Sequence, residues 1–248
     1  MRYFVTITLI ITLLLCNQLS YSQSNTSIGF SVGGAKLSMG EVNDDLEDTY
    51  DYMSSAGAPI SPPNKLTSSL FLEGNISTKF VNNILIGVNV NYISNSGNVK
   101  YTDFEGYLEE KYDVNTIEFL GNIGVAVPIN NSSTELFFKV HGGYGLATAE
   151  HIGTIIVYSS PEYNSDVQND LSKGYFTARL QGGIEIKMQQ IGINISLSYR
   201  HANAGVLTGD QIENGHNIGE QAVKSIRGDD IEFDYSGILF SVGVSFYL

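Results

Sequence analysis

The chain has 248 residues with 26 acidic side chains against 13 basic ones, and its net charge of −13 excludes the basic surface that nucleic-acid binding needs. That length suits one all-β domain. The composition, with 26 glycines, 15 tyrosines, 12 phenylalanines and 5 prolines, is typical of strands and turns. The single cysteine, Cys16, lies near the N-terminus, so we expect no disulfide in the mature chain.

Residues 1–22 have the features of a cleaved secretory signal peptide. Arg2 supplies a positive charge, and residues 4–15 form an apolar stretch that is too short for a transmembrane helix. Ser20-Tyr21-Ser22 places small residues at the two positions that a signal peptidase recognises. We therefore expect two parts, a signal peptide at 1–22 and one exported domain at 23–248.

Eight stretches after the leader alternate between apolar and small or polar side chains, which predicts strands with two unlike faces. They lie at about 26–38, 67–80, 84–95, 112–127, 134–149, 174–188, 191–201 and 235–248. Their connections are alternately short (81–83, 128–133, 189–190) and long (39–66, 96–111, 150–173, 202–234), and the long ones hold most of the acidic residues. Short turns on one side and long loops on the other are the layout of outer-membrane barrels. The predicted fold is an all-β, eight-stranded antiparallel up-and-down transmembrane β-barrel.

The last strand indicates which face meets lipid. Ile238, Phe240, Val242 and Val244 alternate with serine and glycine, whereas the outer face of a soluble sandwich carries charged residues. Aromatic residues at both ends of this apolar band are candidate girdles at the lipid headgroups: Phe30, Phe80, Phe138 and Phe246 near the turns, and Tyr92, Tyr144, Phe176 and Tyr199 near the loops. A secreted lipocalin-like barrel is the soluble alternative, and it would need an apolar lumen.

The opposite faces carry charged residues that would point into the lumen: Glu73, Glu118, Lys139, Arg179, Glu185 and Arg200. The interior of an eight-stranded barrel is just wide enough for side chains. Buried charges must pair there, because an unpaired one is strongly destabilising. These residues therefore predict an internal ion-pair network that plugs the barrel. The alternative is a narrow conduction path, widened by inward glycines such as Gly87, Gly124, Gly143 and Gly183.

The opening strand Ile28-Gly-Phe-Ser-Val-Gly-Gly34, the glycine-aromatic strands and the aromatic C-terminus resemble the small outer-membrane β-barrel domain family, which includes OmpA/OmpX-type barrels and PorT-like proteins. The resemblance covers 23–248 and is architectural. It implies that Phe246 and Leu248 form a C-terminal signal for the barrel-assembly machinery, although the last residue is Leu rather than Phe.

Two kinds of chemical site can be considered, and neither is predicted. The histidines His141, His151, His201 and His216 stand in no His-x-Ser pair, so we expect no catalytic residues. The acidic runs 41–48 and 229–234 offer oxygen ligands of the kind Ca²⁺ takes, but they lack EF-hand spacing. We read them as hydrophilic surface and expect neither metal nor cofactor.

The apolar run Ile155-Ile156-Val157-Tyr158 is unusual for a solvated loop. It favours a hairpin that extends the barrel strands beyond the membrane, and a partner-contact edge is the alternative. The sequence thus predicts an integral outer-membrane protein, in contact with outer-membrane lipid, with a non-catalytic structural or interaction role. Its acidic loops would meet a surface protein partner. A narrow channel for small solutes and a rim enzyme acting on acyl chains of outer-membrane lipid are the alternatives.

Overall fold

The structure is a computed structural model that describes residues 25–80, 83–129 and 133–248. The predicted signal peptide at 1–22 and Cys16 lie outside the described residues. Eight long strands form the barrel: β1 (Asn25–Leu37), β2 (Ser69–Lys79), β3 (Ile84–Thr102), β4 (Gly106–Pro128), β5 (Thr134–Val157), β6 (Ser165–Met188), β7 (Ile191–His201) and β12 (Gly237–Tyr247).

Each of these strands is antiparallel to its neighbours, and β12 closes the ring by pairing with β1 on one side and β7 on the other. Val242 lies opposite Val32 and Ile195 in these two ladders, and the three side chains are 42–54% exposed on the outside. Their inward neighbours are buried serines such as Ser31, Ser241 and Ser196. The predicted fold class and the predicted inside-outside alternation are therefore confirmed.

The predicted aromatic residues occupy positions consistent with that alternation. Phe30, Phe138, Phe176 and Tyr199 are more than half exposed. Tyr144 and Phe246 are also exposed, and Phe80 and Tyr92 are half-buried. Their role as girdles at the headgroup level stays a prediction.

Four strands continue well beyond the barrel, so the expected loop at 96–111 is wrong. The ladder between β3 and β4 runs from Ile84 opposite Val125 to Thr102 opposite Tyr107, which leaves only residues 103–105 as a turn. Alternation explains the continuation, because Val99, Tyr112 and similar residues are buried on one face there. Residues 150–155 and 165–170 likewise pair as a hairpin between β5 and β6, as the sequence favoured.

These extensions form what we call the projecting sheet: residues 96–102, 106–113, 150–157 and 165–172, together with β9 (Thr208–Glu213) and β10 (His216–Ala222). Strand β9 pairs with β6, and β10 pairs with β9. The expected loop at 202–234 therefore contains strands. This segment also contains β8 (Asn203–Val206) and β11 (Glu232–Asp234), which pair with each other. A short 3₁₀ helix, η2 (Pro161–Tyr163), lies in the turn between β5 and β6.

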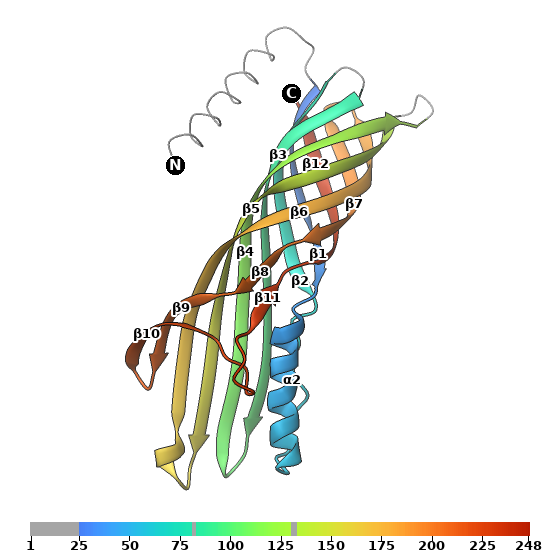
Figure 1. The fold of residues 1–248 in the computed structure, drawn as a ribbon. Helices are drawn as coiled ribbons and strands as arrows, with labels where there is room; N and C mark the ends of the chain where they lie inside the picture. Colours follow the sequence, from blue (N-terminus) through green and yellow to red (C-terminus); the bar gives the residue numbers. More distant parts are fainter. Residues whose placement is uncertain (1–24, 81–82, 130–132) are drawn as a thin grey trace.

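The expected loop at 39–66 begins with a helix, α2 (Gly40–Ser55), which lies along one face of the projecting sheet (Figure 1). Its buried residues Val42, Asp45, Leu46 and Thr49 follow the i, i+3, i+4, i+7 spacing of one helix face. Among the described residues, no helix is both long and apolar enough to cross a membrane.

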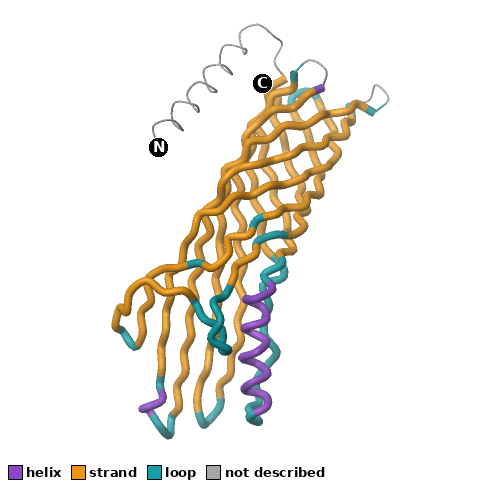
Figure 2. Tube along the Cα trace, viewed as in Figure 1, coloured by secondary structure: helices purple, strands orange, loops and turns teal. Residues whose placement is uncertain are grey.

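The hydrophobic core lies between α2 and the projecting sheet. Val42 and Leu46 are fully buried there with Tyr112, Leu207 and Phe233. The helix and most of the turn segments gather at this end of the molecule, whereas the C-terminus lies at the other end (Figure 2). The protein thus has two chemically different parts. One is a barrel with a polar interior, and the other, which we call the projecting unit, consists of α2, the projecting sheet and the segments packed against them, and has an apolar core.

Candidate functional site: a plugged lumen and a pocket in the projecting unit

Two buried ion pairs fill the middle of the lumen. Arg179 pairs with Glu73, and both side chains are almost fully buried. Arg200 pairs with Glu118 at 2.8 Å, and both side chains are completely buried. The Tyr175 hydroxyl lies 2.7 Å from Arg200 Nη2 and 3.1 Å from Glu118 Oε1, so it links the two charges.

Each nitrogen of the Arg200 guanidinium donates a hydrogen bond. Its Nε donates to Glu118 Oε1 at 3.0 Å, and its Nη1 donates to the Tyr235 carbonyl oxygen at 3.0 Å. Asn91 donates to the other oxygen of Glu118 at 3.2 Å. A guanidinium is always charged, and these hydrogen bonds, together with the ion pair to Glu118, offset the cost of removing that charge from water.

The two remaining members of the predicted network, Lys139 and Glu185, form no ion pair with any residue that the structure describes. Lys139 Nζ lies 5.2 Å from the centre of the Phe137 ring, and Glu185 lies beside the Tyr247 hydroxyl. Sequence reasoning missed a third charged cluster at the turn side, where Glu135 accepts from Lys79 and Lys187, both at 2.8 Å.

The signal for this cluster was present in the sequence. The alternation that points Lys139, Glu185 and Glu73 inward also points Glu135, Lys187 and Lys79 inward, a few residues along the same three strands.

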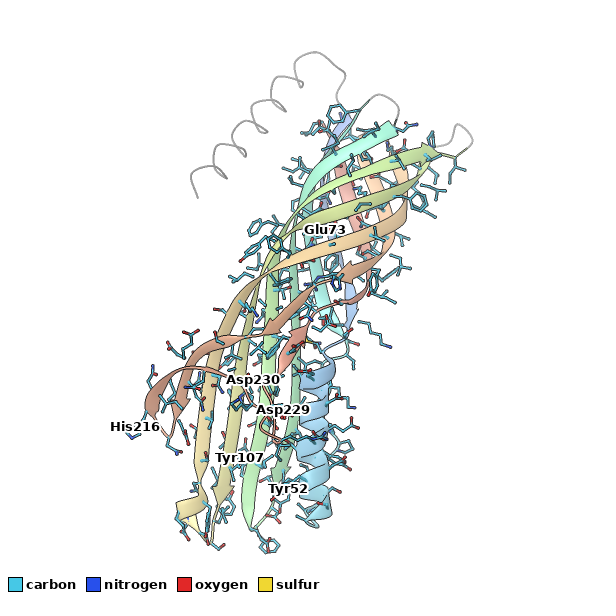
Figure 3. All side chains as sticks on the ribbon, in the orientation of Figure 1. Tyr52, Glu73, Tyr107, His216, Asp229 and Asp230 are labelled. Atoms are coloured by element: carbon cyan, nitrogen blue, oxygen red, sulfur yellow. The ribbon has the colours of Figure 1, made fainter. Side chains whose placement is uncertain are left out.

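The inward glycines do not open a path. A Cβ on Gly143 would lie 2.0 Å from the Phe119 carbonyl oxygen, and one on Gly124 would lie 2.2 Å from the Phe138 carbonyl oxygen. These glycines therefore allow neighbouring backbones to approach closely. The turn-side half of the lumen holds a cavity of only about 40 Å³. In Figure 3, Glu73 lies within the barrel, far from Tyr52 and Tyr107 at the end of the projecting unit.

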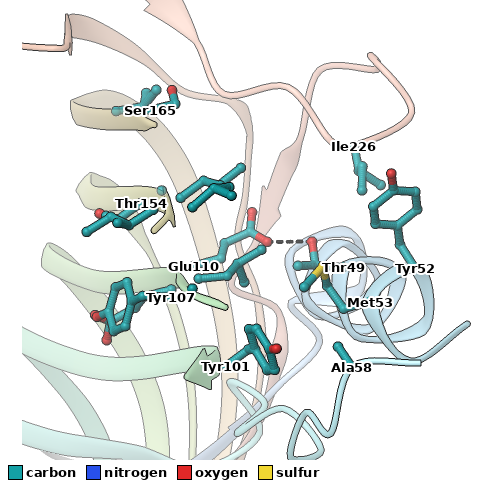
Figure 4. Close-up of a pocket in the computed structure, with 18 of the residues that line it drawn as sticks. Thr49, Tyr52, Met53, Ala58, Tyr101, Tyr107, Glu110, Thr154, Ser165 and Ile226 are labelled. Carbon is teal, nitrogen blue, oxygen red and sulfur yellow. Dashed lines mark hydrogen bonds between the residues drawn. The ribbon is translucent and has the colours of Figure 1, made fainter. Parts of the chain in front are cut away.

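A large cavity lies in the projecting unit. Beyond Thr49 the space between α2 and the sheet is not filled by side chains, which leaves about 1030 Å³. Figure 4 shows this space between the sheet and the second half of α2. Its walls come from the ends of β3 to β6, from α2 and from residues 222–226, and they include Met53, Ile155 and Val167. Segments far apart in the sequence thus build one pocket.

A cluster of titratable groups lies at the floor of this pocket, where Glu110 and His151 line the cavity and Asp45 and Tyr112 pack against them. Thr49 Oγ1 donates to Glu110 Oε2 at 2.6 Å, the contact dashed in Figure 4. The Tyr112 hydroxyl donates to Asp45 Oδ2 at 2.7 Å, and His151 Nε2 lies 3.5 Å from Glu110 Oε1. The His151 ring stacks on Tyr112 with their centroids 4.6 Å apart. We call Asp45, Glu110, Tyr112 and His151 the floor cluster.

Burial and neighbouring charge divide the protons within the floor cluster. Burial, followed by the negative charge of Glu110, raises the pKa of Asp45 from 3.8 to about 7. Burial opposes the ionisation of Glu110, but hydrogen bonds with His151, Asp45 and Thr49 outweigh it and lower the pKa of Glu110. Burial and the two carboxylates raise the pKa of Tyr112 well above its usual value. Near neutral pH, Glu110 is therefore anionic and Asp45 is partly protonated.

Asp45 also fixes the segment that closes one side of the pocket. The backbone N–H of Ile226 donates to Asp45 Oδ1 at 3.1 Å, and Arg227 pairs with Asp48 of α2. The helix, the sheet and this segment therefore meet at one carboxyl group. Sequence reasoning missed Glu110 as a site residue and considered Asp45 only as part of the acidic run 41–48, because no local pattern relates residues that are so far apart.

The histidines are distributed over different environments. His141 lies in the lumen and His151 in the pocket floor, whereas His201 and His216 are exposed. Ser236 Oγ lies 3.4 Å from His201 Nδ1, but this serine is buried and its hydroxyl already accepts from the Ala202 N–H.

The acidic runs 41–48 and 229–234 do not gather into a cation site. Asp48 pairs with Arg227, and Asp230 pairs with Lys224 at 2.7 Å. Within the described ranges, no group of three or more His, Cys, Asp and Glu side chains is placed to hold a metal ion.

The match to a known family agrees with this architecture. The family model for the outer membrane protein β-barrel domain matches residues 7–246. No curated protein matches by sequence. Among solved structures, Neisserial surface protein A is 9% identical, with a TM-score of 0.41 over 92% of this chain and 98% of that one. The Yersinia pestis attachment protein Ail, solved with the heparin analogue sucrose octasulfate, is 10% identical, with a TM-score of 0.34 over 90% and 98%.

The family match spans nearly the whole described chain and accounts for both the closed strand ring and its apolar exterior. It also identifies the outer membrane as the location of the barrel. The chain belongs to the outer membrane protein β-barrel domain family.

Proposed function

We propose that this protein is a non-catalytic receptor of the outer membrane, in which a plugged barrel anchors an extracellular binding unit. The observation that carries the proposal is the cavity of about 1030 Å³ between α2 and the projecting sheet. A volume of this size is at the upper end of those that hold small ligands. The pocket also combines apolar walls with a few convergent polar groups, as ligand sites do.

The filled lumen supports an anchoring role over a conducting one. Arg179 and Arg200 cross its centre in full burial, and each is held by a carboxylate. Moving a permeant ion past them would require breaking buried ion pairs, which costs several kcal/mol, about 3–5 for each pair broken. A binding role therefore agrees better with the geometry than a channel does.

The surroundings of the barrel complete the proposal. The apolar exterior contacts outer-membrane lipid, and Phe246 and Leu248, 46% and 79% exposed at the end of β12, are offered to the assembly machinery. A surface protein or a smaller ligand would be the partner of the projecting unit, since recognition residues concentrate outside a rigid scaffold.

Filling the pocket tests the proposal. At Gly153, which lines it, an added Cβ would approach nothing closer than His151 Cε1 at 3.7 Å, so a larger side chain can enter the cavity without disturbing the backbone. Gly153→Phe is compared with Thr102→Phe, which places the same ring at an exposed site that does not line the pocket.

Both variants and the parent protein, folded in nanodiscs, are screened against one library of small molecules and short peptides by ligand-observed NMR. We expect ligands that bind the parent and Thr102→Phe but not Gly153→Phe. If no ligand distinguishes Gly153→Phe from Thr102→Phe, the pocket is not a binding site and the proposal is wrong.

A further inference from the structure

We infer that the pocket selects a cationic peptide segment, in which the ammonium or guanidinium of a lysine or arginine pairs with Glu110 while its stem lies against apolar walls. This inference rests on the proposed function and adds the chemistry of the ligand. It is carried by three independent features of the pocket: its unpaired acceptor, its charge and its walls.

The first feature is an acceptor without a partner. Asn169 is 2% exposed and lines the pocket, and among the described residues its Oδ1 has no hydrogen-bond partner. Its Nδ2 lies 3.0 Å from His151 Nδ1, which accepts from this amide in the tautomer that carries the proton on Nε2. Oδ1 is therefore free to accept, and a buried free acceptor calls for a donor from the ligand.

The second feature is the charge of the lining. Four carboxylates line the pocket, and the single lysine there, Lys224, is already paired with Asp230. The carboxylates all come from one hairpin, that of β3 and β4: Asp103, Glu105, Glu109 and Glu110. Glu110 lies on the floor, where its burial leaves little water to screen it. An anionic ligand would be repelled. A ligand with several positive charges can pair both with Glu110 on the floor and with the other three carboxylates of the lining, which we call the rim.

The third feature is the apolar and aromatic surface between floor and rim. Met53, Ile155 and Val167 offer aliphatic contacts, which suit the methylene stem of lysine or arginine. Tyr101 and Tyr107 also line the pocket (Figure 4), and aromatic rings attract cations, as Lys100 Nζ at 5.0 Å from the centre of the Tyr107 ring illustrates. A cavity of about 1030 Å³ is larger than one such side chain needs, so it also accommodates the flanking residues of a peptide.

Isothermal titration calorimetry of the full chain in zwitterionic nanodiscs tests the inference, with empty nanodiscs as the reference for peptide binding to lipid. The probes are three blocked pentapeptides that differ only at two positions: acetyl-Leu-Lys-Leu-Lys-Leu-amide, its glutamine counterpart and its glutamate counterpart. We expect binding of the lysine peptide alone, weakened by raising the salt concentration. Butylamine is the fourth probe, and it asks whether a free small amine suffices.

Two substitutions locate the charge that matters. Glu110→Gln keeps an acceptor for the Thr49 hydroxyl but removes the charge, and it should weaken binding of the lysine peptide about tenfold or more. Glu220→Gln removes an exposed carboxylate of β10 that does not line the pocket, and it should leave the affinity unchanged. Hydrogen exchange of α2 in both variants verifies that the helix stays docked.

The outcomes separate this inference from the proposed function. If the glutamine peptide binds as tightly as the lysine peptide, and Gly153→Phe abolishes both, the pocket binds ligands but does not select cations. If no peptide binds the parent protein, or if butylamine binds better than the lysine peptide, the peptide inference is overturned. The receptor proposal is then judged by the library screen alone.

Discussion

Replacing Glu118 with glutamine tests whether the buried ion pairs of the lumen are essential for the barrel. The substitution keeps the size of the side chain but leaves the guanidinium of Arg200 without a counter-charge at a site where both side chains are completely buried. Arginine cannot lose its proton in a protein, so the charge stays. Removing one partner of a buried pair costs about 3–5 kcal/mol. Glu118→Gln should lower the free energy of unfolding by that amount.

The assay is urea unfolding in phospholipid vesicles, with the folded fraction read from the faster gel mobility of unboiled barrels. A gel readout suits this chain because it contains no tryptophan. Glu47→Gln is the matched control, since Glu47 pairs with Lys65 at 2.7 Å on the surface and such pairs contribute about 0–1 kcal/mol.

The double variant Glu118→Gln with Arg200→Met separates the pair from the residual charge. It removes both charges, so it should be less destabilised than Glu118→Gln alone. The reasoning is refuted if Glu118→Gln unfolds at the same urea concentration as the parent protein, or if the double variant is the less stable of the two.

Three further predictions follow from the same structure. Between pH 5 and 7, docking of α2 should weaken as pH rises, by up to about 1.4 kcal/mol per pH unit, because burial and the charge of Glu110 raise the pKa of Asp45 to about 7 and so make folding favour the protonated acid. Hydrogen exchange of α2 measures this change. In planar bilayers the parent protein should show no conductance steps, because buried ion pairs fill its lumen. Val242→Arg, at the centre of the apolar exterior, should cost about 2–4 kcal/mol in the vesicle assay.

Each of these three predictions has a control or an outcome that would contradict it. Asp45→Asn, which mimics the protonated acid, should flatten the pH dependence, and an unchanged slope would assign it to another group. Reproducible single-channel steps would show that the plug conducts. Ile218→Arg on β10, which is 47% exposed outside the barrel, should be almost neutral. Equal effects of the two arginines would contradict the assignment of Val242 to lipid.

The sequence by itself determined the barrel. Alternation with a period of two is a local property, so eight stretches could be identified one by one, each with an apolar face and a small or polar face. The same rule pointed Glu118 and Arg200 inward, and the structure brings them together. The alternation rule failed at 96–111. The strand continues there with Val99 and Tyr112 buried on one face, but charged residues on the other face made the segment resemble a loop.

Only the tertiary structure decided the pocket. The helix at 40–55 carries the spacing of an amphipathic helix, but its dense carboxylates made the segment resemble a solvated loop. The floor then joins Asp45 of α2, Glu110 of β4 and His151 of β5, together with the N–H of Ile226. No periodicity connects these positions, because contacts between distant segments depend on how the elements pack. The alternation of side chains therefore specified the barrel, whereas the docking of α2 on the extensions of four strands created the candidate binding site.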